Sequence, residues 1–123
     1  MIRVLITGKN GQLEQCFQSL EASYPQISFI FKSSEELDIT DKSEVDSVFE
    51  SLNSFDYCIN CAAYTAVDKA ETDTDNAVNV NVNGPKHLAQ ACKKYDVKLI
   101  HISTDFVFDG NAKSAYKELD STN

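Results

Sequence analysis

The chain is poor in basic residues and has no long apolar segment. Its 123 residues include 11 Lys and Arg against 19 Asp and Glu, for a formal net charge of −8 at pH 7. Nucleic-acid-binding proteins usually present a basic face to phosphates, and an anionic membrane surface attracts the same kind of face. No run of 18 apolar residues is present, as a transmembrane helix requires. We therefore expect no nucleic-acid partner and no membrane partner.

The cysteines do not form a metal-binding pattern. Of the four, only Cys58 and Cys61 stand as a C-x-x-C pair, and such a pair is a weak signal without a second one. It lies in residues 55–61, an apolar segment of strand character, in which positions three apart point to opposite faces. We expect buried, reduced cysteines and no metal site.

The chain also lacks a signal peptide, internal repeats, low-complexity tracts and linkers. The apolar run within residues 1–8 is too short for a signal peptide and ends at Gly8. We interpret it as the first strand of a cytoplasmic protein. A length of 123 residues with 42% hydrophobic residues fits one domain, residues 1–123.

Segments of strand character alternate with segments of helical periodicity. Strands are predicted at residues 2–7, 27–31, 57–60 and 98–102, and helices after Gly11, from the N-cap Asp41, and over about 75–95. Such alternation implies a parallel sheet with right-handed crossovers. We predict an α/β fold, a doubly wound parallel sheet of the Rossmann-like kind. Here it would be incomplete, with the first four strands only, in the order 3-2-1-4.

Two of the helices carry specific expectations. In the last one, Pro85 has no N–H to donate to the carbonyl of Asn81, so we predict a kink there. The first helix is expected to bury an apolar face at helical spacing, formed by Leu13, Cys16, Phe17 and Leu20.

The turn after the first strand has glycines in a pattern that suits phosphate binding. It reads Thr-Gly-Lys-Asn-Gly-Gln-Leu-Glu over residues 7–14. Glycines at a strand-to-helix turn let backbone N–H groups approach a pyrophosphate at the helix N-terminus. Glu14 replaces the third glycine, which normally permits close helix–strand packing, and its charge would repel a pyrophosphate. A tight turn without a ligand explains the glycines equally well.

Polar or small residues follow the other strands. Ligands of open parallel sheets bind beyond the carboxyl ends of the strands. Small residues follow Asn60, where a flat ring could lie against the backbone, and a Ser-Thr-Asp cluster at 103–105 follows the fourth strand. Asp38 and Ile39 could flank an adenine, whereas Asp41 is better explained as a helix cap.

Four segments together resemble the N-terminal half of the dTDP-4-dehydrorhamnose reductase family, within the extended short-chain dehydrogenase/reductase superfamily. The blocks A-Y-T-A-V-D-K-A-E and S-T-D-x-V-F-D-G are specific, and the glycine turn alone is not. The resemblance covers essentially the whole chain. Its segments are residues 8–13, 37–41, 60–71 and 103–110.

The resemblance implies reduction of the 4-keto group of a dTDP-sugar by NADPH or NADH, with a homodimer as one possible assembly. It implies a catalytic hydroxyl at Thr104, which bonds the substrate's carbonyl oxygen, and a sugar-nucleotide contact at Asp105. Lys32 and the two serines after it could accept a 2′-phosphate, which favours NADPH. The implied cofactor contacts are Gly8, Asn10, Gly11, Gln12 and Leu13 for the pyrophosphate, Asp38 and Ile39 for the adenine, and Ala62, Ala63 and Tyr64 for the nicotinamide.

The family's catalytic Tyr-x-x-x-Lys is not found in these 123 residues, because Tyr116 is followed four residues later by Asp120. By the resemblance, we expect that motif a few residues beyond Asn123. Hydride transfer to a carbonyl needs a proton donor, and a threonine hydroxyl is a poor acid. We therefore expect an N-terminal fragment of a reductase, inactive alone. One alternative is a non-catalytic regulatory subunit similar to the beta subunit of methionine adenosyltransferase, which Glu14 slightly favours. Another is a different sugar-nucleotide enzyme, such as an epimerase.

Overall fold

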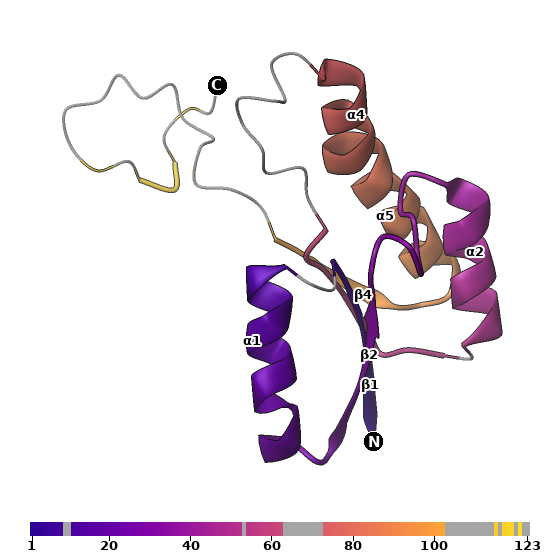
Figure 1. Cartoon of the computed structure of the whole chain (residues 1–123), viewed down its shortest axis with the longest axis vertical. Helices are drawn as coiled ribbons and strands as arrows, with labels where there is room; N and C mark the ends of the chain where they lie inside the picture. Colours follow the sequence, from indigo (N-terminus) through magenta and orange to yellow (C-terminus); the bar gives the residue numbers. More distant parts are fainter. Residues whose placement is uncertain are drawn as a thin grey trace.

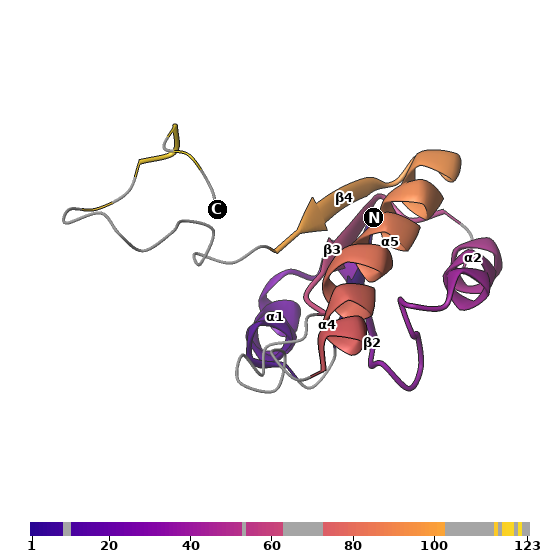
Figure 2. The ribbon, with the colours of Figure 1, turned by 90° about the horizontal axis from the view of Figure 1, so that it is seen from above.

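Four parallel strands form one sheet with helices on both faces (Figures 1 and 2). The computed structural model describes residues 1–8, 11–52, 54–62, 73–102, 115, 117–119 and 121. This arrangement confirms the predicted doubly wound α/β fold. The strands are β1 Ile2–Thr7, β2 Ile27–Lys32, β3 Tyr57–Asn60 and β4 Lys98–His101.

The strands lie in the order β2-β1-β3-β4, which differs from the predicted 3-2-1-4. The direction in which strands are added still reverses beside β1. On that side, however, β1 pairs with β3, and β4 pairs with β3. The reason lies in the faces that the helices occupy. Helix α1 (Gln12–Leu20) covers one face and α2 (Lys42–Ser51) the other (Figure 1). Right-handed crossovers on opposite faces carry the chain in opposite directions.

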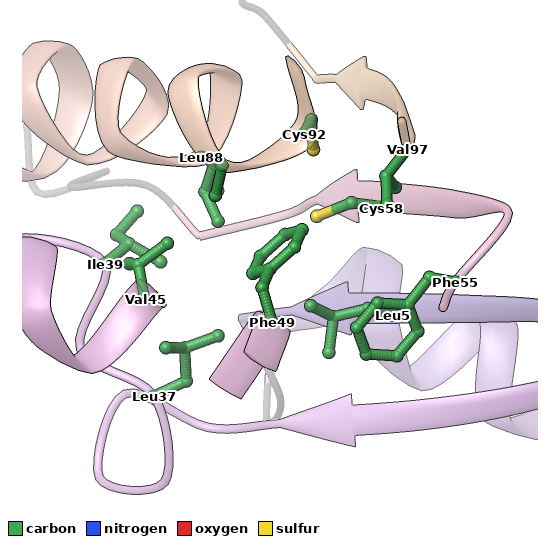
Figure 3. Close-up of a cluster of buried hydrophobic side chains, with 11 residues drawn as sticks. Leu5, Leu37, Ile39, Val45, Phe49, Phe55, Cys58, Leu88, Cys92 and Val97 are labelled. Carbon is green, nitrogen blue, oxygen red and sulfur yellow. The ribbon is translucent and has the colours of Figure 1, made fainter. Parts of the chain in front are cut away.

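The larger core lies between the sheet and the helices α2 and α5 (Gly84–Lys94) (Figure 3). Phe49 is 2% exposed, and its ring lies 5.7 Å from that of Phe55, edge to face. Asp41 caps α2 as predicted, because its carboxylate accepts the N–H groups of Ser43 and Glu44. The core residues are Leu5, Leu37, Ile39, Val45, Phe49, Phe55, Cys58, Leu88, Ala91, Cys92 and Val97.

The opposite face carries α1 and the short 3-10 helix η1 (Glu21–Ser23). Here the predicted apolar face of the first helix is wrong in part. Leu13 and Leu20 are 38% and 49% exposed and Cys16 is exposed, whereas Glu14 is fully buried. The helix lies on the sheet along the line of Glu14 and half-buried Phe17, so an open apolar groove of about 400 Å³ remains beside Leu20.

The helical stretch before β4 is interrupted where proline predicted it. It consists of α4 (Thr74–Val78), a π-helical turn η2 (Asn79–Asn83) and α5. The N–H of Gly84 donates to the carbonyl of Asn79, five residues earlier. Pro85 therefore lies in the first turn of α5, where its missing N–H is tolerated. None of the helices in the described ranges is long and apolar enough to cross a membrane.

Gly84 allows α5 to approach the segment after β2. A Cβ placed on Gly84 would lie 2.5 Å from Cδ1 and 2.6 Å from Cγ1 of Ile39, whose side chain is 4% exposed. His87 adds a polar contact, since its Nδ1 lies 2.8 Å from the carbonyl oxygen of Ile39. The segment around Ile39 is therefore fixed beneath the start of α5.

We expect Gly84→Ala to destabilise the fold, although Ala is ordinarily the better helix former by about 1 kcal/mol. The added methyl group meets buried Ile39, and overpacking typically costs about 1–3 kcal/mol. The free energy of unfolding in urea measures the loss. Ile39→Ala removes both atoms that the methyl group meets, so the loss should shrink in that background. Equal losses in both backgrounds would contradict the contact.

Candidate functional site

Two turns meet at the carboxyl end of the sheet. β1 and β3 are parallel neighbours with Thr7 opposite Asn60, so the chain leaves both strands side by side. Gly8 has φ of 84°, and a Cβ on it would lie 2.7 Å from the nitrogen of Ala62 and from the carbonyl carbon of Cys61. The two turns thus touch backbone to backbone, at the point where the strand order reverses.

A network of polar side chains joins the ends of three strands. The hydroxyl of Thr7 donates to Oδ1 of Asn60 at 2.6 Å, and the N–H of Ala62 donates to the same oxygen at 3.1 Å. Nδ2 of Asn60 lies 3.2 Å from Nδ1 of His101 at the end of β4. Thr7 and Asn60 are 1% and 0% exposed. Sequence reasoning gave these three residues no role, although polar residues that end apolar strands are a usable signal.

The N-terminus of α1 opens onto this edge. Gly11 is its N-cap, with no side-chain capping bond, and its own N–H donates back to the Gly8 carbonyl at 3.0 Å. The first N–H groups of a helix have no partner within the helix, and they favour an anion. Gln12 and Leu13 begin α1 and are exposed. The predicted pyrophosphate contacts Gly8, Gly11, Gln12 and Leu13 therefore lie together, while Asn10 is outside the described residues.

Glu14 places a carboxylate in the same helical turn. Its side chain is 0% exposed, between α1 and the sheet. Burial, and then the charge of Glu14, raises the pKa of the Cys61 thiol to about 11. The carboxylate of Glu14, which we predicted to oppose a pyrophosphate, is thus buried in the first turn of α1.

The residues predicted to border an adenine differ in their surroundings. Oδ1 of Asp38 accepts the N–H and the hydroxyl of Thr40, at 3.0 and 2.6 Å, and the Asp38 side chain is half-buried. Ile39 is packed under Gly84, so its side chain belongs to the core. Of this pair, Asp38 has the side chain that a ligand could reach.

The end of β2 carries a carboxylate that sequence reasoning missed. Lys32, the last residue of β2, is half-buried. The N–H of Ser33 donates to Oε1 of Glu36 at 3.1 Å. An acidic residue in this region usually binds the ribose 2′-hydroxyl of NAD. The local charge is therefore mixed, with Lys32 suited to a 2′-phosphate and Glu36 suited to a hydroxyl.

The remaining predicted site residues, Ala63, Tyr64, Thr104 and Asp105, lie outside the described residues.

Cys58 and Cys61 face opposite sides of the sheet, as predicted: Cys58 lies in the core with α5, and Cys61 packs on the α1 side. A side-chain hydrogen bond between Cys58 and Cys92, followed by burial, raises the pKa of Cys58 well above its ordinary value (Figure 3). In the described ranges, no three His, Cys, Asp or Glu side chains gather as metal ligands.

Gly8→Ala should destabilise the protein by at least about 2 kcal/mol. A left-handed φ costs an ordinary residue about 1–2 kcal/mol, and the Cβ would overlap backbone atoms, which cannot rotate away. Gly11→Ala is the matched control, because Gly11 has φ of −79° and a Cβ there would meet, among the described residues, the Gly8 oxygen alone, at 3.1 Å. Urea denaturation of both variants gives the two losses. Similar losses would show that the turn does not depend on close approach.

Glu14→Gln should lower the pKa of Cys61 from about 11, because it removes the charge that disfavours the thiolate. The pKa should stay above its ordinary value, since burial is the larger cause. The rate of iodoacetamide alkylation at Cys61, followed by mass spectrometry, should then rise at lower pH than in the parent protein. Exposed Cys16 provides the standard for reagent reactivity. An unchanged pH profile at Cys61 would place Glu14 too far away to matter.

Comparisons with known proteins agree on one family. The model of the RmlD substrate binding domain matches residues 2–123. The dTDP-4-dehydrorhamnose reductase of Aggregatibacter actinomycetemcomitans is 41% identical over 98% of this chain and 40% of its own length. The reductase of Mycobacterium tuberculosis H37Rv is 40% identical, with 98% and 40% covered.

Solved structures lead to the same family. A dTDP-4-dehydrorhamnose reductase from Clostridium acetobutylicum superposes with a TM-score of 0.93 at 40% identity, covering 99% of this chain and 43% of that one. The Bacillus anthracis enzyme, solved in complex with NADP, gives 0.92 at 36% identity, covering 100% and 44%. The chain thus spans about 40% of the length of these curated relatives. It belongs to the RmlD substrate binding domain family.

Proposed function

We propose that the protein carrying this chain reduces the 4-keto group of a dTDP-sugar with NADPH or NADH, in the formation of dTDP-L-rhamnose. The observation that carries the proposal is the backbone contact between the Gly8 turn and Ala62, beside the uncapped N-terminus of α1. At Gly8 it leaves room for backbone and none for a Cβ, at the place where the strand order reverses. Relatives that are named dTDP-4-dehydrorhamnose reductases support the chemistry.

The described residues fit a dinucleotide. At Gly8, any Cβ would overlap the backbone of the neighbouring turn, so the position is open to backbone alone. The amides at Gly11 to Leu13 suit a diphosphate. Asp38 would lie on the adenine side and Ala62 on the nicotinamide side, followed in sequence by Ala63 and Tyr64. The cofactor would supply the hydride, and the NADP complex of the Bacillus anthracis relative supports its class.

Thr104 and Asp105 are assigned to the substrate by family resemblance. A carbonyl oxygen gains negative charge as hydride arrives, and a hydroxyl that donates to it stabilises that charge. The proton itself requires a stronger acid, for which we propose the family's Tyr-x-x-x-Lys. On this proposal the 123 residues alone bind the cofactor in part and do not turn over. A cytoplasmic location and a possible homodimer belong to the same proposal.

Glu14 favours a second candidate, a regulatory subunit that does not catalyse. A buried carboxylate in the first turn of α1 opposes a bound diphosphate. A protein selected to bind nucleotide weakly, and to act through a partner, would tolerate this residue more readily than an enzyme. Turnover by the whole protein separates the two candidates.

In the whole protein, Thr104→Val should lower turnover by about 10²–10³, the usual loss for one donor to a developing oxyanion. Steady-state kinetics with a 4-keto dTDP-sugar, with NADPH and NADH compared, provides the measurement. Thr74→Val, at an exposed threonine of α4, is the control and should leave turnover unchanged.

Near-parental turnover in a folded Thr104→Val protein would remove Thr104 from catalysis. Absence of turnover in the parent protein with either cofactor would overturn the reductase assignment and favour the regulatory subunit.

A further inference from the structure

The side-chain amide of Asn60 has only one orientation that satisfies its neighbours. One end lies 3.1 Å from the backbone nitrogen of Ala62, which can only donate, so that end must be the oxygen Oδ1. The hydroxyl of Thr7 donates to the same oxygen at 2.6 Å. The amide nitrogen Nδ2 therefore faces the end of β4.

This orientation determines which ring nitrogen of His101 carries the proton. Nδ2 of Asn60 can only donate, and Nδ1 of His101 lies 3.2 Å from it. In this contact Nδ1 must accept, so the ring proton of His101 is on Nε2. His101 is exposed, so burial does not impose this state, and the contact with Asn60 is what selects it.

The end of β4 has few other contacts of this kind among the described residues. β4 has four residues and pairs, within the described ranges, with β3 alone. The last backbone bond between the two strands, from the N–H of Ile102 to the carbonyl of Asn60, is long at 3.3 Å. The side-chain link from His101 to Asn60 lies at the same place and ties β4 to the turns that leave β1 and β3.

We infer that His101, as the tautomer with its proton on Nε2, is a positioning residue that holds the end of β4 in register with the Gly8 and Ala62 turns. The functional part of this inference rests on the proposed reductase activity. Thr104, the proposed catalytic residue, follows His101 by three residues in the sequence, so we expect a change at His101 to affect turnover.

The chain offers an internal control for the tautomer, because it has two histidines. Nδ1 of His87 lies 2.8 Å from the carbonyl oxygen of Ile39, which can only accept, so His87 must carry its proton on Nδ1. The structure therefore assigns opposite tautomers to His87 and His101.

Long-range ¹H–¹⁵N spectra of the protein labelled with ¹⁵N-histidine test this assignment without any activity. We expect an unprotonated Nδ1 in His101 and a protonated Nδ1 in His87. The variants His101→Asn and His87→Asn assign the signals by loss. A protonated Nδ1 in His101, or the mixture of tautomers typical of a free imidazole, would overturn the inference.

Variants of His101 test the positioning role. His101→Ala removes the acceptor, whereas His101→Asn keeps an oxygen close to the place of Nδ1. In the whole protein, His101→Ala should lower kcat by roughly tenfold to a hundredfold, the range expected when reacting groups are slightly misplaced. His101→Asn should restore most of the loss. Equal kcat in the parent and His101→Ala proteins, or an equal loss in both variants, would overturn the role.

Backbone amide shifts separate this inference from the proposed function. In His101→Ala the signals of Ile102, Ala62 and Gly8 should move, and in His101→Asn they should return toward the parent positions. If the parent protein has no reductase activity, the proposed function fails and these shifts alone decide the inference. Unmoved signals in His101→Ala would show that the link does not hold the strand end.

Discussion

The site depends on one steric constraint, the contact of two backbones at Gly8 and Ala62. A Cβ on Gly8 would lie 2.7 Å from the nitrogen of Ala62, closer than side-chain carbons ordinarily come. Because the two turns touch, Asn60 can reach Thr7 and the Ala62 amide with one oxygen. The helix after Gly8 consequently begins directly beside the end of β3. The amides that we propose for the pyrophosphate therefore lie close to Ala62, which we propose for the nicotinamide side.

Local chemistry made part of the fold predictable from sequence. A carboxylate that precedes a helix caps it whatever the rest of the chain does, and Asp41 does so. A proline removes one N–H from the helical ladder, and the ladder breaks before Pro85. Both effects lie within a few residues. The strand order, in contrast, depends on packing between distant segments, namely on the face of the sheet on which α2 packs.

The same distinction explains which site residues were found. Glycine spacing predicted the turn, because the need for a positive φ at Gly8 is local. The burial of Ile39 beneath Gly84 joins positions 45 residues apart, and no pattern within either segment reveals it. Glu14 is buried although polar, whereas Leu13 and Leu20 are exposed although apolar. How α1 lies on the sheet decided this, against the periodicity of its own residues.

On the proposed function, two opposed charges in one turn of helix act on the bound cofactor. The N-terminus of α1 presents backbone amides and the positive end of a helix dipole, which stabilise an anion by about 0.3–1 kcal/mol. The buried carboxylate of Glu14 already occupies part of that field. Two unit charges 4 Å apart repel by about 1 kcal/mol in water and about 4 kcal/mol near a protein surface. At such a separation the repulsion would equal or exceed the dipole's attraction, and amide hydrogen bonds from the turn at Gly8 would have to provide the remaining affinity. On the proposed function, the backbone contact at Ala62 would therefore matter more for binding here than in a chain with glycine at position 14.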